Sequence, residues 1–248
     1  MGKTVLITGA SSGIGEHLAL EMAGRGYDLA LTARRLDRLE DLKARIDDKV
    51  RVEVMQLDVT DIEATIAAVQ ALWAKMDGFD IVVANAGCGG DNGVGKGVTD
   101  QQINMVNTNV NGLIATIDPA VALMRARGTG GQIVGVASVA GFRGLPGSSV
   151  YSGTKSFVIT YLQSLRLELK ADNIAVTCLS PGFIDTAINQ DLGDKRPFLV
   201  DVQTGAKSAA DLIEKKVAHS TVPPWPWTGV GALLKVIPDG LMPGGYRD

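Results

Sequence analysis

The sequence predicts an α/β fold in which a doubly wound parallel sheet lies between two layers of helices, a three-layer α/β/α arrangement. Short β-branched runs alternate with longer helical patterns through most of the 248 residues, which is typical of βαβ units. A glycine-rich turn joins the first run to the first helix, as in many sheets of this kind. Because no proline-rich or charge-rich linker separates the two halves, we expect one domain over residues 1–248.

Six strands are expected in chain order, three in each half of the chain. They begin with KTVLIT and end with IAVTCLS, and helical patterns separate them. The expected strands are residues 3–8, 28–33, 51–57, 80–85, 132–138 and 174–180. The expected helices are residues 15–26, 36–46, 61–76, about 100–127 and about 150–171, with a further helical pattern at 207–219.

Three segments interrupt the alternation. Residues 183–206 contain no clear strand, and an irregular loop at the edge of a sheet is where a substrate lid would lie. Residues 88–97 are glycine-dense enough to form a mobile loop. Residues 220–248 form an apolar, proline-broken C-terminal extension, which we expect to pack on the domain. Its alternatives are an oligomer contact, part of an apolar substrate pocket, or a membrane-surface foot, of which membrane contact is disfavoured.

Composition excludes several classes of function. Hydrophobic residues at 46%, charged residues at 21% and a net charge of -3 leave no broad basic surface, so no nucleic-acid partner is expected. The two cysteines, Cys88 and Cys178, are too few for a disulfide framework, which favours a cytoplasmic location. No signal peptide or apolar run of about 18 residues is found. His17 and His219 have no ligand partners in a recognisable pattern, so no metal is expected.

The glycine-rich turn TGASSGIG indicates a dinucleotide. Its glycines are Gly9, Gly13 and Gly15, directly after the first strand and before a helix. Glycine lets the backbone turn sharply and approach a pyrophosphate, whose charge is met by unpaired amides at the helix N-terminus. A turn of this looseness could also occur without a ligand, but its position in a βαβ series favours the nucleotide.

The end of the second strand favours NADP(H), with NAD(H) still possible. The carboxylate that usually binds the ribose hydroxyls of NAD is missing from LTARRLDRL, and Arg34 and Arg35 could pair with a 2′-phosphate instead. Arg34 is the stronger candidate because it lies nearer the strand end. Alternatively, both arginines begin a solvated helix beside acidic residues. Asp58 could accept a hydrogen bond from an adenine amine, or it could cap the next helix, as Thr60 or Asp61 also could.

Tyr151 and Lys155 lie four residues apart in YSGTK. On a helix this spacing places both side chains on one face. A lysine ammonium there stabilises tyrosinate and would lower a phenol pKa that is otherwise about 10, making Tyr151 a proton donor near neutral pH. Alone, the pair is more often a half-buried ring and a solvated amine.

Taken together, these stretches resemble the short-chain dehydrogenase/reductase family over most of the chain. The matching stretches, in the family's order and spacing, are TGASSGIG at 8–15, LDV at 57–59, NAG at 85–87, NTNVNG at 107–112, ASVAG at 137–141, YSGTK at 151–155 and SPG at 180–182. The resemblance implies the single-domain Rossmann branch with a Tyr-x-x-x-Lys active site. It also implies hydride transfer between a nicotinamide and a carbonyl compound or alcohol.

The resemblance implies roles at matching positions. Ser138 would hold the substrate carbonyl against Tyr151, Lys155 would bind the nicotinamide ribose, and Asn109 would anchor a water that links Lys155 to solvent. Asn109 could instead be a buried polar bracket, and Ser138 an ordinary strand-end hydroxyl. Further residues are expected to contact the cofactor beside the glycines, the arginines, Asp58, Tyr151 and Lys155: Ser11, Ser12, Ile14, Val59, Asn85, Ala86, Gly87, Pro181, Gly182, Ile184 and Thr186.

The predicted activity is NADPH-dependent carbonyl reduction, or the reverse alcohol oxidation, on a small-molecule substrate. Apolar residues flank the expected site and suggest an apolar substrate, although core packing explains them equally well: Phe142, Phe183, Ile184, Ile188 and Leu192. The alternative is a non-catalytic protein that senses NADPH. We expect a homodimer through the helices at about 100–127 and 150–171, or a homotetramer. The extension with Trp225 and Trp227 departs from the family's usual ending and puts tetramer assembly by that route in doubt.

Overall fold

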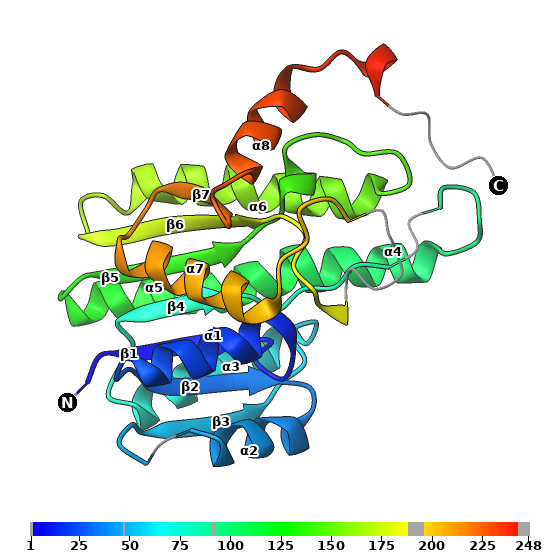
Figure 1. Ribbon diagram of the computed structural model, residues 1–248. Helices are drawn as coiled ribbons and strands as arrows, with labels where there is room; N and C mark the ends of the chain where they lie inside the picture. The colour runs from blue at the N-terminus through cyan, green and yellow to red at the C-terminus, as the bar shows by residue number, and fades with distance from the viewer. Residues whose placement is uncertain (1, 47, 91–92, 188–195, 243–248) are drawn as a thin grey trace.

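The computed structural model describes residues 2–46, 48–90, 93–187 and 196–242, and it confirms the predicted doubly wound parallel sheet (Figure 1). Within these residues seven strands lie in the order β3-β2-β1-β4-β5-β6-β7, and neighbouring strands are parallel. The strands are β1 (Thr4–Thr8), β2 (Asp28–Ala33), β3 (Val52–Gln56), β4 (Ile81–Ala84), β5 (Gly131–Val136), β6 (Ile174–Pro181) and β7 (His219–Val222).

Helices cover both faces of the sheet, and each face has its own apolar core. On one face lie α1 (Gly13–Gly24), α2 (Leu36–Ala44) and α7 (Val202–Glu214); on the other lie α3 (Ile62–Lys75), α5 (Gly112–Arg127) and α6 (Ser149–Glu168). All five residues of β1 and all four of β4 are buried, because side chains on both faces of a central parallel strand meet helices.

The strand order reverses between β1 and β4. The chain leaves β3 at one edge of the sheet and returns to form β4 on the other side of β1. In such sheets ligands bind at the carboxyl ends of the strands beside this reversal. The segments that follow β1 and β4 begin there, and they are the first two parts of the candidate site.

Two expectations near the end of the chain need correction. The sequence predicts six strands, whereas the structure has a seventh, β7, which has only four residues and is followed at once by two prolines. The helix expected at 207–219 is α7, which begins at Val202 and ends at Glu214. Asp201 accepts a hydrogen bond from the Thr204 amide and starts the helix early. Lys216, with φ of 49°, turns the chain away after it.

The single helix expected at about 100–127 consists of three parts. It begins with α4 (Thr99–Val106), continues as a π-helical turn (Asn107–Asn111) and runs on as α5, which contains Pro119. A π turn inserts an extra residue and often marks a functional position. Asn109 lies in this turn.

The predicted loop at 88–97 includes residues 91 and 92, which lie outside the described residues.

The C-terminal extension forms a helix after β7. This helix, α8 (Trp227–Val236), is followed by a 3-10 turn at Asp239–Leu241. Trp227 is buried, so this part of the extension packs on the sheet domain as expected, and residues 243–248 lie outside the described part. Among the helices described, none combines the length and apolarity needed to cross a membrane.

Candidate active site

The glycine-rich turn after β1 is held against the end of β4. Gly9 has φ of 69°, a conformation that side chains disfavour, and a Cβ there would lie 2.8 Å from the Ala86 Cα. A Cβ on Gly15 would overlap the Gly9 carbonyl oxygen and lie 2.5 Å from the Asn85 Nδ2. Both positions therefore require glycine for close backbone approach.

Asn85 fastens this turn. Its Nδ2 donates to the carbonyl oxygens of Thr8 at 2.9 Å and Gly9 at 3.2 Å. The Thr8 hydroxyl in turn accepts from the amides of Asn85 and Ala86, both at 3.1 Å. Asn85 and Ala86 thus lie beside the glycine-rich turn, while their contact with the cofactor remains a prediction. Thr8 has a bracing role that was not predicted, although its place as the last residue of a buried strand was visible in the sequence.

Thr186 also reaches the glycine-rich turn. A Cβ on Gly13, whose φ is 58°, would lie 3.2 Å from the Thr186 Cγ2. The loop after β6 therefore meets the N-terminus of α1. Ser12 precedes that helix and Ile14 packs against the core beneath it.

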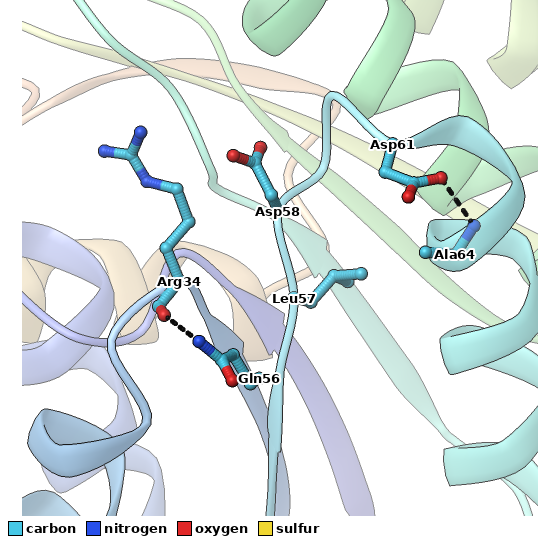
Figure 2. Close-up of a pocket in the computed structure, with 6 residues that line it drawn as sticks. All are labelled: Arg34, Gln56, Leu57, Asp58, Asp61 and Ala64. Atoms are coloured by element: carbon cyan, nitrogen blue, oxygen red, sulfur yellow. Dashed lines mark hydrogen bonds between the residues drawn. The ribbon is translucent and has the colours of Figure 1, made fainter.

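Arg34 and Asp58 face the same pocket at the ends of β2 and β3. The pocket has a volume of about 400 Å³ and is lined by Arg34, Gln56, Leu57, Asp58, Asp61 and Ala64. Figure 2 shows the Arg34 guanidinium and the Asp58 carboxylate extending in the same direction. Gln56 donates to the Arg34 carbonyl oxygen at 2.9 Å and so fixes the backbone from which the guanidinium extends.

Arg35 points to the glycine-rich turn. Its Nη2 donates to the Ser11 Oγ at 3.1 Å and to the Ser11 carbonyl oxygen at 3.3 Å. The two consecutive arginines thus flank one region from different sides, with Arg34 lining the pocket and Arg35 touching the turn. Arg35 therefore lies where an anion bound to the turn would meet it, while Arg34 lies on the wall of the pocket.

The cap of α3 is Asp61. Its carboxylate accepts from the Ala64 amide at 3.0 Å, whereas Asp58 accepts from the amide and hydroxyl of Thr60, at 3.0 and 2.9 Å. Of the alternatives left open for this segment, Asp61 performs the capping and Asp58 remains on the wall of the pocket. Val59 is buried and packs against the start of α5 at Gly112.

Ser138 and Tyr151 meet at the ends of β5 and α6. Ser138 is buried, and its Oγ accepts from the Ala140 amide at 3.1 Å. Burial raises the pKa of Tyr151 above its ordinary value of 10, and a hydrogen bond with the Ser138 side chain partly offsets this rise. Tyr151 therefore keeps its proton near neutral pH. The expectation that the pKa of Tyr151 is lowered is wrong, because burial raises it.

Lys155 is buried beside the tyrosine. Its Nζ lies 5.8 Å from the centroid of the Tyr151 ring and donates to the Val136 carbonyl oxygen at 3.0 Å. Burial lowers the pKa of Lys155 to about 8. The prediction that Tyr151 and Lys155 share one helix face is confirmed. Because the pKa of Lys155 is about 8, its side chain is largely protonated at neutral pH and loses its proton as the pH rises past about 8.

Asn109 brackets the loop after β4 to α6. Its Oδ1 accepts from the Cys88 amide at 2.9 Å, and its Nδ2 donates to the Cys88 carbonyl at 3.0 Å and to the Thr154 hydroxyl at 3.1 Å. Gly87 lies between Asn109 and Lys155, since a Cβ there would be 3.2 Å from Oδ1 and 3.4 Å from Nζ. Asn109 therefore makes the buried polar contacts that were considered as its alternative role, while its role in anchoring a water remains a prediction.

Pro181 is the last residue of β6 and Gly182 begins the loop after it, while their place beside the nicotinamide remains a prediction. The residue that packs on this loop was not predicted. A Cβ on Gly182 would overlap the indole of Trp227, which is only 3% exposed. Ile184 is buried and bridges Val200, so it supports this loop. The sequence signal was the unusual tryptophan-rich tail, which could not be assigned to any surface. Ile188 and Leu192 lie outside the described residues.

The sequence is similar to those of known oxidoreductases. A family model described as short chain dehydrogenase matches residues 3–197. An uncharacterized oxidoreductase of Myxococcus xanthus is 36% identical over 249 residues, covering 99% of this chain and 96% of the relative.

Two solved structures share the fold and were determined with different nicotinamide cofactors. A short-chain dehydrogenase from Sphingobium yanoikuyae in complex with NADPH has a TM-score of 0.82 and 31% identity, covering 97% of this chain and 98% of that one. A 3-ketoacyl-(acyl-carrier-protein) reductase from Brucella melitensis complexed with NADH has a TM-score of 0.81 and 27% identity, covering 90% and 98%.

Proposed function

Because the chain belongs to the short-chain dehydrogenase/reductase family, we propose that it is an NADPH-dependent oxidoreductase that interconverts a small carbonyl compound and the corresponding alcohol. The observation that carries the proposal is the meeting of Ser138, Tyr151 and Lys155. The two hydroxyls are hydrogen-bonded, and the ammonium lies 5.8 Å from the ring centroid. A nucleotide sensor would need no such proton donor.

The residues present fit a dinucleotide. Close backbone packing at Gly9 and Gly15 leaves the amides at the start of α1 beside the turn, where a pyrophosphate would be held. Arg34 and Arg35 would meet a 2′-phosphate, and Asp58 would face the adenine end of the pocket. When bound, NADPH supplies the hydride that reduces the carbonyl carbon.

Tyr151 acts as the general acid in reduction. With its pKa raised by burial, it holds its proton near neutral pH and donates it from the hydroxyl to the carbonyl oxygen as the alcohol forms. Ser138 donates a hydrogen bond to the same oxygen and keeps it within reach of Tyr151. In alcohol oxidation the proton returns to the tyrosinate oxygen.

Lys155 stabilises the tyrosinate that remains after proton transfer. Its ammonium is protonated below its pKa of about 8, and it is buried where Coulombic attraction is poorly screened. The lysine therefore acts on the product of proton transfer more than on the resting phenol. Asn109 would anchor the water through which Lys155 and Tyr151 regain a proton from solvent.

The cofactor preference is tested with Arg34→Ala. Loss of a charge-assisted contact to the 2′-phosphate should weaken NADPH binding by roughly tenfold or more, with NADH binding little changed. Titrations followed by protein fluorescence measure both affinities. An equal loss for both cofactors would refute the assignment of Arg34 to the 2′-phosphate.

The reaction itself is tested by mixing the protein and NADPH with a panel of aldehydes, ketones and diketones. We expect tight NADPH binding and oxidation of NADPH with at least some members. Tight binding with no turnover on any carbonyl compound would instead support the sensor function.

We further propose a cytoplasmic location, which cell fractionation can test.

The proposed assembly is a homodimer through α4, α5 and α6. Apolar side chains are exposed along these helices, with Ile103 at 53% and Leu167 at 76%. Phe157 and Tyr161 stack on α6 with ring centroids 5.5 Å apart. Burial of such side chains between two copies would supply the hydrophobic driving force for association.

A further inference from the structure

Helix α8 contacts two loops that begin at the carboxyl ends of neighbouring strands. The first loop follows β5 and carries Ser138; the second follows β6 and carries Gly182. Figure 1 shows α8 following β7, close to the segment that joins β5 to α6. The matched family region ends at residue 197, so α8 lies outside it.

The first contact of α8 is made by Trp227 on the loop after β6. The indole covers Gly182 so closely that a Cβ on Gly182 would overlap it. Its ring packs edge-to-face on Phe183, with centroids 5.5 Å apart, and on Phe198, with centroids 6.0 Å apart. The buried indole N–H has no hydrogen-bond partner among the described residues, so packing accounts for this tryptophan.

The second contact of α8 is made by Gly231 on the loop after β5. The Phe142 ring fits against Gly231 so closely that a Cβ there would overlap it. The Lys235 Nζ lies 4.7 Å from the centroid of the same ring, within the range of a cation–π contact. Phe142 is therefore held by one face of α8.

Arg143 fastens the end of α8 to the same loop. Its guanidinium donates to the carbonyl oxygen of Leu234 at 3.3 Å and to that of Ile237, and it pairs with the Asp239 carboxylate. These acceptors lie at the C-terminus of the helix, where a cation is favourable. The helix is thus tied to the loop that begins at Ser138.

We propose that α8 is a clamp that sets substrate specificity, with Trp227 and Gly231 as positioning residues for the two loops. Trp227 acts through Gly182 and Phe183, and Gly231 acts through Phe142. In this proposal Phe142 and Phe183 form an aromatic, apolar wall of the substrate site. Such a wall favours carbonyl compounds whose larger substituent is an aryl or branched alkyl group. This inference rests on the proposed function and names the substrate class for the same site.

The test at Trp227 uses three substitutions. Trp227→Leu removes the aromatic packing and should raise KM for acetophenone by roughly tenfold, with a much smaller change in kcat and in KM for acetone. Trp227→Phe keeps one aromatic ring but loses the five-membered ring of the indole with its N–H, so it should retain more of the wild-type preference than Trp227→Leu. Trp225→Leu is the matched control, because Trp225 is 81% exposed, and it should leave both KM values unchanged.

The test at Gly231 has its control on the same helix. Gly231→Ala displaces Phe142 and should raise KM for acetophenone selectively. Gly229→Ala adds the same methyl where no described atom outside the helix backbone lies within 4 Å, and it should behave as wild type. Unchanged preference in both Trp227→Leu and Gly231→Ala would overturn the clamp. Equal losses for both ketones with weaker NADPH binding would also overturn it, because they indicate general damage.

Calorimetric binding of acetophenone to the protein–NADP⁺ complex separates failure of the clamp from failure of the proposed function. If wild-type protein binds acetophenone but reduces no carbonyl compound, the proposed activity fails, and weaker binding by Gly231→Ala still supports the clamp. If wild type and Gly231→Ala bind acetophenone equally, or neither binds it, the clamp is overturned whatever the turnover. Melting temperatures show that each variant is folded before it is scored.

Discussion

Tyr151→Phe removes the hydroxyl that gives up its proton while leaving the ring in place. Because general acid catalysis contributes roughly 10²–10⁴-fold, we expect turnover to fall by that order and NADPH affinity to stay close to wild type. Initial rates of NADPH oxidation and a fluorescence titration measure the two quantities. If the variant loses NADPH binding as well, the ring is structural and the proton-donor role is wrong.

Lys155 predicts a pH dependence of stability. Its pKa falls from the ordinary 10.5 to about 8 in the folded chain, so between these values the unfolded chain holds a proton that the folded chain has released. The free energy of unfolding should therefore rise with pH across this window, by an amount on the order of 1–3 kcal/mol. Below about pH 8 Lys155 contributes no such rise, because its side chain is protonated in both the folded and the unfolded chain.

The matched measurement compares wild type with Lys155→Met by urea unfolding between about pH 7 and about pH 9.5. The difference between the two curves isolates the lysine, and the upper limit stays below the titration of Tyr151, whose pKa is raised above 10. Parallel curves across the window would show that Lys155 is not the titrating group.

At the scale of single residues, the sequence located the reactive groups better than it described their chemistry. Spacing predicted that Tyr151 and Lys155 share a helix face, because helical geometry is local. The pKa of Tyr151 depends on burial by segments far apart in the sequence, so its direction could not be obtained from spacing. The contact between Trp227 and Gly182 was not predicted for the same reason, since it is entirely tertiary.

At the scale of elements, the turn between β1 and α1 gives the next prediction. Gly15→Ala would force apart the Gly9 carbonyl and Asn85, so we expect a loss of stability of about 1–3 kcal/mol and weaker binding of NADPH and NADH by similar factors. This differs from Arg34→Ala, which should discriminate between the cofactors. Urea unfolding and parallel titrations of the two cofactors measure these effects.

Gly24→Ala is the control for that variant. It lies in the last turn of the same helix, and no described atom outside the helix backbone lies within 4 Å of the added methyl. It should be neutral or stabilise the protein by up to about 1 kcal/mol, because alanine favours helix. Wild-type cofactor affinity in Gly15→Ala would mean that this turn does not hold the nucleotide.

The strands buried between two layers of helices were the elements that the sequence predicted best. β1, β2 and β4 to β6 are almost wholly buried, so each reads as a short apolar run bounded by polar residues. β7 lies at the edge of the sheet, where β6 is its one partner among the described strands, and it starts with an exposed histidine. Its four residues lack that signature, and the prolines after it resemble an irregular tail.

At the scale of the whole molecule, two exposed apolar surfaces offer different routes of assembly. One lies on α4, α5 and α6, where the homodimer is proposed. The other lies on the outer side of α8, where Leu233 is 59% exposed. The resemblance to the family favours the first surface, and the second surface corresponds to the oligomer contact considered for the C-terminal extension. The residues exposed on each surface could not be predicted from the sequence, because exposure depends on the folded chain.

Ile103→Glu tests the first surface. Ile103 is 53% exposed on α4, and a carboxylate buried there between two copies would be unpaired, so we expect the dimer to dissociate into folded monomers. Leu233→Glu places the same charge on α8 and should leave the dimer intact. Sedimentation velocity measures the assembly, and circular dichroism shows that the variants are folded. If Leu233→Glu dissociates the dimer and Ile103→Glu does not, the interface lies on the C-terminal extension, because the introduced carboxylate disrupts only the surface that is buried between the two copies.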